Sequence, residues 1–240
     1  MSTRLHLNSA RSPRTPVGSA GEWAAFFDGS TELAAKDWPP LLWWAMFGPG
    51  DLAEARIADT EDAGTEAHAE LLRDWGEATY PYLVVDQRTA VARLHARREA
   101  LTGRIGARYA PVYEAFTALV DARFGPYVLV RTEALADGGG GEGGVRGHFE
   151  ETLADLDRLD AGRTVPGGRL DGLIADFRRW RHTDPVRLLS GVGPGWPDDD
   201  LRERLDAAGG GRSTAAGWTV AVLVLLGVVA CAVLATTTSS

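Results

Sequence analysis

A carboxylate between an apolar run and a helix is the candidate for catalysis in this sequence. Asp86 follows the run Tyr82–Val85, which has the pattern of a buried strand, and it precedes a helix that we expect to begin near Thr89. Many α/β enzymes place a general acid or base at such a strand end. Asp and Thr at this position also cap helices and form turns. Asp86 is therefore a candidate catalytic residue, with helix capping as the alternative.

The helix expected after Asp86 carries a row of arginines along one edge. Residues 88–108 contain six arginines and a single glutamate, Glu99. Guanidinium groups in a row can bind phosphate, lipid headgroups or an acidic partner. Alternatively, their stems cover apolar surface and their charges meet acidic neighbours inside the fold. The candidate anion- or partner-binding residues, here called the arginine row, are Arg93, Arg97, Arg104 and Arg108.

A second basic cluster surrounds Trp180, at the C-terminal end of another expected helix. Cations are favoured in the last turn of a helix, so this cluster has a structural explanation of its own. Its members are Arg178, Arg179, Arg181 and His182.

The sequence indicates neither a cofactor nor a metal. The glycine tract 138–144 formally contains G-x-G-x-x-G, but several residues separate it from the preceding strand, where a dinucleotide site would need it to follow directly. The five histidines show no metal-ligand spacing, and no G-x-S-x-G or phosphate-binding loop motif is present. We therefore expect no cofactor and no metal site.

The C-terminal residues predict a membrane anchor. Residues 215–235 contain no charged side chain, and at about 1.5 Å per residue they reach about 31 Å as a helix, the thickness of a hydrocarbon core. Trp218 and Arg212 occupy positions typical of the membrane interface. We expect a tail-anchored, single-pass protein of the cell membrane that contacts the bilayer through this span. Its bulk should be cytoplasmic, because arginines precede the span and the N-terminus lacks a signal peptide.

The remaining chain is divided by composition. We expect a mobile segment over residues 1–20 with a short strand around Leu5 and Leu7, and a cytoplasmic domain over 21–206 with a flexible glycine loop at 137–147. A glycine-rich linker, 207–214, then joins the domain to the anchor, and 236–240 form a short tail.

The expected fold is a mainly helical α+β domain with a few short strands, followed by the transmembrane helix. Apolar periodicity predicts helices over 65–75, on Val91–Ile105 and on Val112–Val120, and strands at Tyr82–Val85 and Tyr127–Val130. Further helices are expected on the apolar residues Phe149, Leu153 and Leu156, and on Leu170, Leu173, Ile174, Phe177 and Trp180. A short buried helix is expected within 41–47.

Composition narrows the possible functions. The hydrophobic fraction of 45% and the eight tryptophans indicate a packed core, and the net charge of −8 disfavours binding to nucleic acid. We predict a membrane-tethered module that presents its aromatic-rich N-terminal third or the arginine row to a protein partner. The alternative is a membrane-tethered enzyme with a carboxylate-based site near Asp86.

Overall fold

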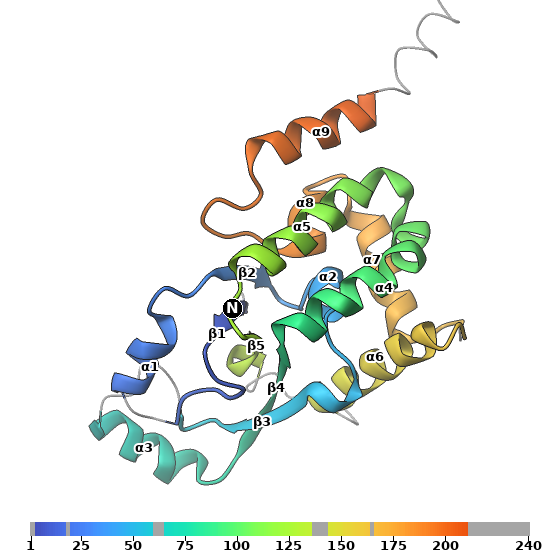
Figure 1. Cartoon of the computed structure of the whole chain (residues 1–240). Coiled ribbons are helices and arrows are strands. Elements are labelled where there is room, and N and C mark those ends of the chain that lie inside the picture. The colour runs from blue at the N-terminus through green and yellow to red at the C-terminus, as the bar shows by residue number, and fades with distance from the viewer. Residues whose placement is uncertain (1–2, 18–19, 60–64, 136–143, 164–165, 211–240) are drawn as a thin grey trace, which may run out of the picture. The chain divides into compact units, whose positions relative to one another are not determined.

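The computed structural model describes residues 3–17, 20–59, 65–135, 144–163 and 166–210. The chain divides into two compact units, Met1–Asp198 and Asp199–Ser240. The first unit holds a sheet and most of the described helices, and the second contributes one described helix (Figure 1). The mainly helical α+β architecture that the sequence predicts is confirmed for the described residues, which form nine α-helices and one antiparallel sheet.

The sheet has five antiparallel strands in the order β2-β1-β5-β4-β3. The strands are β1 (Arg4–Ala10), β2 (Glu32–Lys36), β3 (Leu52–Arg56), β4 (Thr79–Asp86) and β5 (Tyr127–Arg131). The expected strand around Leu5 and Leu7 is present and lies inside the sheet, between β2 and β5, with both leucines fully buried. The interpretation of residues 1–20 as a mobile segment is therefore wrong for residues 4–10, because pairing on both edges fixes that strand.

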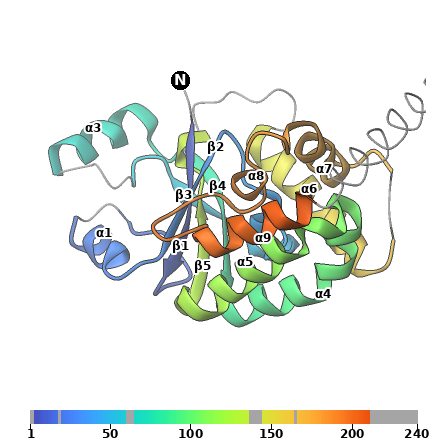
Figure 2. The ribbon, with the colours of Figure 1, turned by 90° about the horizontal axis from the view of Figure 1, so that it is seen from above.

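Helices cover both faces of the sheet (Figure 2). On one side lie α1 (Ala20–Phe27) and α3 (Thr65–Trp75), and on the other side lies the larger helical layer. That layer contains α2 (Leu41–Trp44), α4 (Gln87–Ile105), α5 (Ala110–Arg123), α6 (Gly144–Asp160), α7 (Arg169–Trp180) and α8 (Pro185–Ser190). Short 3₁₀ turns occur at Pro49–Asp51, Ala107–Tyr109 and Glu133–Leu135.

Two apolar cores result from the alternation of side chains along the strands. In β4, Tyr80 and Tyr82 pack against Trp23 and Phe26 of α1, whereas the neighbouring Leu83 points to the opposite face. Leu83 lies directly across from Val130 of β5, and Val130 from Leu7 of β1, so these residues share the face that the helical layer covers.

The aromatic run within 41–47 belongs to the core of the helical layer. Trp43, Trp44 and Phe47 are fully buried. The Trp43 indole N–H donates to the carbonyl of Ser190 at 2.8 Å, and that of Trp44 to the carbonyl of Pro39 at 3.0 Å. Because these rings are enclosed and their polar atoms are paired, this part of the N-terminal third does not present an aromatic surface to a partner.

Two expected loop boundaries change. Helix α6 begins at Gly144, so residues 144–147 are helical rather than part of a flexible loop over 137–147, and residues 137–143 lie outside the described residues. Helix α9 (Asp199–Gly210), which belongs to the second unit, extends into the expected linker 207–214. Its first turn is acidic, and Arg202 pairs with Asp199 one turn away at 3.2 Å.

The expected membrane anchor falls outside the described part of the chain. Residues 215–235, with Arg212, Trp218 and the tail 236–240, are not described. Among the helices that are described, none has both the length and the apolar character that crossing a bilayer requires.

Candidate functional site

Asp86 acts as the N-cap of α4. Its Oδ1 accepts a hydrogen bond from the backbone N–H of Thr89 at 2.9 Å. The Thr89 hydroxyl and this N–H both donate to the carboxylate, which lowers the pKa of Asp86 below its ordinary value. The side chain is exposed at the end of β4. The geometry thus agrees with the capping alternative, and a carboxylate with a lowered pKa is a poor general base at neutral pH.

The arginine row is engaged inside the fold. Arg97, only 2% exposed, donates from Nε and Nη2 to Asp160 of α6 at 2.8 and 2.6 Å. Its Nη1 also donates to two main-chain carbonyls after α2, those of Ala45 at 2.9 Å and Phe47 at 2.7 Å. Arg97 therefore fastens α4 to α6 and to the chain that follows α2.

The other members of the row have internal partners as well. Arg93 pairs with Asp51 and donates to the carbonyl of Met46 at 3.1 Å, and Arg104 pairs with Asp171 of α7. Burial and the nearby Arg178 lower the pKa of Arg104 below its ordinary value.

The guanidinium of Arg108 lies over the ring of Tyr109, 4.5 Å from its centroid. The row therefore does not form one exposed edge, because three of its four arginines form ion pairs with carboxylates from distant segments.

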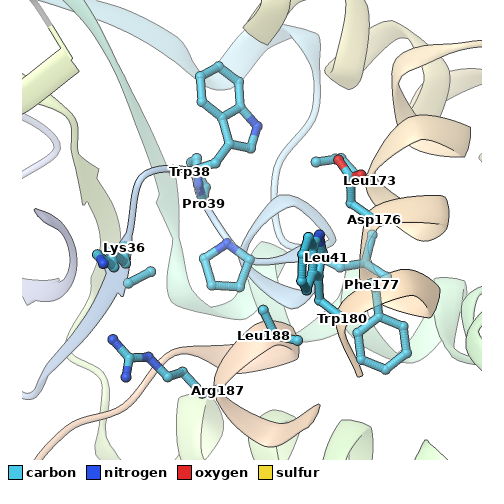
Figure 3. A pocket seen from close by; sticks show the side chains of 12 residues that line it. Lys36, Trp38, Pro39, Leu41, Leu173, Asp176, Phe177, Trp180, Arg187 and Leu188 are labelled. Carbon is cyan, nitrogen blue, oxygen red and sulfur yellow. The ribbon is translucent and has the colours of Figure 1, made fainter. Parts of the chain in front are cut away.

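A groove between β2, α7 and α8 is a candidate binding surface (Figure 3). Its central hollow has a volume of about 230 Å³. Pro39 and Pro40 line it from the segment that joins β2 to α2, and Leu41 from the start of α2. Leu173 and Trp180 line it from α7, and Leu188 from α8. Side chains from three separate parts of the chain thus converge on one mainly apolar depression.

Local structure explains how Trp38 comes to stand at this groove. Asp37 adopts a left-handed conformation with φ 65°, and its N–H donates to the carbonyl of Thr3 at 2.8 Å, so the chain turns sharply after β2. The Trp38 ring then packs edge-to-face on Phe149 of α6, with 5.6 Å between the ring centroids. Its orientation is fixed by the core, while the side chain remains partly exposed.

The opposite wall is one face of α7. Leu173, Asp176, Phe177 and Trp180 are spaced three, four and seven residues apart, which places them on the same side of the helix. Phe177 is buried against Tyr109, whereas Trp180 is 48% exposed at the last position of α7. The Arg179 guanidinium lies 5.1 Å from the Trp180 ring centroid and covers part of this ring.

The groove continues into a polar hollow at each end. One, of about 370 Å³, shares Trp38, Leu173 and Asp176 with the centre and adds His148 and Arg169. The hollow at the other end is basic and has a volume of about 510 Å³. It shares Lys36 and Arg187 with the centre and adds Arg4. The whole groove therefore has an apolar middle and charged ends, and within the described part of the chain no group of His, Cys, Asp or Glu is arranged to hold a metal.

Sequence reasoning identified only part of this site. It noted Trp180, but as the centre of a basic cluster, and Arg178 of that cluster instead donates to the carbonyl of Arg104 at 3.1 Å. A large aromatic residue at the end of an amphipathic helix is a signal that was available. The contributions of β2 and α8 had no such signal, because neither element was expected.

Comparison of the chain with protein-family models, with curated proteins and with solved structures gives no match. Functional inference therefore depends on the groove and its chemistry.

Proposed function

We propose that this protein is an interaction module whose groove binds a polypeptide partner through a bulky apolar side chain. One observation supports the proposal above the others: Trp180, nearly half exposed, lines an apolar hollow whose other walls come from the β2–α2 segment and from α8. An exposed tryptophan beside a preformed depression is the usual composition of a binding hot spot.

The size of the central hollow suits an inserted side chain. Pockets for drug-sized ligands have volumes of roughly 300–1,000 Å³. The hollow between Trp38 and Trp180 has about 230 Å³, which suits a single aromatic or branched aliphatic side chain. Asp176 and Lys36 at its rim can pair with polar groups that flank the inserted residue.

We further propose that the module works at the cytoplasmic face of the cell membrane. The uncharged span 215–235 and the arginines that precede it support this location. Tethering raises the local concentration of a binding domain near a membrane partner, so an anchor has a direct use for an interaction module. The capping role of Asp86 gives the enzyme alternative no corresponding support.

Selection of peptides from a phage-displayed random library on the detergent-purified full-length protein tests this proposal. We expect the selected peptides to share a bulky apolar residue and to lose binding to the Trp180→Ala variant by about 30-fold or more, the effect of removing a hot-spot side chain worth about 2 kcal/mol.

Trp75→Ala is the matched control, because Trp75 is 43% exposed on α3, which lies on the other side of the sheet. It should leave affinity unchanged. Selected peptides that bind the two variants equally well would place the binding surface elsewhere.

A further inference from the structure

Three cations converge on the basic end of the groove without a carboxylate to neutralise them. Arg4 of β1, Lys36 of β2 and Arg187 of α8 line the same hollow of about 510 Å³, and all three side chains are exposed. Most of the described arginines form ion pairs, but none of these three does so with any residue that the structure describes. Such a grouping is unusual for a chain with a net charge of −8.

The cations are held together by main-chain structure rather than by chance side-chain positions. Arg4 and Lys36 lie directly opposite each other in the β1–β2 register. Residues 191–193, which follow α8, bond to the free edge of β2: the Val192 N–H donates to the Ala34 carbonyl at 2.9 Å, and the Ala34 N–H to the Val192 carbonyl at 2.7 Å. This bridge keeps α8, and with it Arg187, beside Lys36.

The arrangement is costly in the absence of an anion. Like charges directly opposite each other on antiparallel strands are destabilising. Asp176, which lines the neighbouring hollow, lies on the opposite side of the groove from Lys36 and Arg187 (Figure 3). Asp37 follows Lys36 in the chain but does not line either hollow. The three cations therefore line a hollow to which no described carboxylate contributes.

We propose that Arg4, Lys36 and Arg187 form a binding site for a phosphate-class anion. A phosphate monoester carries a charge of about −1.5 to −2 at neutral pH and three acceptor oxygens, which matches three converging cations better than a single carboxylate does. The volume of the hollow exceeds what a phosphate group alone needs and leaves room for the organic part of an ester. Soluble phosphate esters and phospholipid headgroups both have this chemistry.

Isothermal titration of the detergent-purified full-length protein tests the site, with pyrophosphate and short-chain phosphatidic acid as separate probes. We expect at least one probe to bind, and which one binds identifies the source of the phosphate. In the variant Arg4→Gln/Lys36→Gln/Arg187→Gln, affinity should fall about tenfold for each cation removed. Its melting temperature should be equal to or above that of the wild type, because the repulsion between Arg4 and Lys36 is relieved.

A second triple variant separates a specific site from a general effect of charge. Arg73, Arg88 and Arg163 are exposed, and changing all three to Gln removes the same net charge elsewhere on the chain. Affinity for the probe should remain within about twofold of the wild type, since distant exposed charges are screened. No binding of either probe, or equal loss in both triple variants, would overturn the proposal. Because neither probe requires a polypeptide partner, this result is independent of the proposed function.

Discussion

Replacing Arg97 by glutamine tests whether the arginine row serves the fold or a ligand. The substitution removes the two bonds to Asp160 and leaves the carbonyls of Ala45 and Phe47 without their donor. A buried polar group without a partner costs about 1–3 kcal/mol. Asp160 is 40% exposed, so water replaces much of what that carboxylate loses. We therefore expect the free energy of unfolding to fall by about 3–5 kcal/mol, mostly because the two main-chain carbonyls lose their donor.

Thermal denaturation followed by circular dichroism measures this loss. In a domain of this size about 1 kcal/mol corresponds to about 2–4 °C, so the melting temperature should drop by about 10 °C. Arg88→Gln is the control on the same helix, because Arg88 is exposed, and its effect should stay within about 0.5 kcal/mol. A loss below about 1 kcal/mol for Arg97→Gln would show that the buried pair does not form and would restore the anion-binding interpretation of the row.

Three further outcomes follow from the structure. Asp86→Ala should lower the free energy of unfolding by about 1 kcal/mol at neutral pH, because the helix cap is lost. Since the folded-state pKa of Asp86 is lowered, the stabilisation by this cap is present above the unfolded pKa of about 3.9 and is lost as the pH falls through the folded-state pKa. Denaturation at several pH values measures this dependence. Gly193→Ala should lower the free energy of unfolding, measured by chemical denaturation, by about 1–3 kcal/mol, because a Cβ at this position would overlap the carbonyl oxygen of Glu32. Gly172→Ala is the control: its Cβ would meet open space, so it should not lower the free energy of unfolding. The full-length protein should resist carbonate extraction from membranes, whereas a chain ending at Gly210 should not. Recovery of the full-length protein in the soluble fraction would contradict an anchor at 215–235.

Apolar periodicity was sufficient to predict the longer elements. Helices α4, α5, α6 and α7 bury most of the residues whose spacing indicated a common face, although Trp180 of α7 is exposed. Helix α3 spans the expected residues 65–75. Strands β2 and β3 were missed because their sequences, ELAAK and LAEAR, are rich in alanine and lack the branched and aromatic residues that mark strands. These two strands form because β1 and β4 pair with them in the folded protein.

The same limit explains what was missed at the site. The arginine row was visible in the sequence, but its partners Asp51, Asp160 and Asp171 lie more than 40 residues away, so sequence alone could not decide between solvent and ion pair. The groove depends on an equally distant contact, the bridge between Ala34 and Val192, which sets α8 beside β2.

Fluorine NMR of the full-length protein labelled with 5-fluorotryptophan tests the central claim most directly. Single Trp→Phe variants assign the resonances, and a library-selected peptide is then titrated into the labelled protein. If the groove binds the partner, the signals of Trp180 and Trp38 shift with the peptide concentration while that of Trp75 on α3 stays in place. Saturable binding that moves the Trp75 signal and leaves Trp180 and Trp38 unchanged would contradict the account.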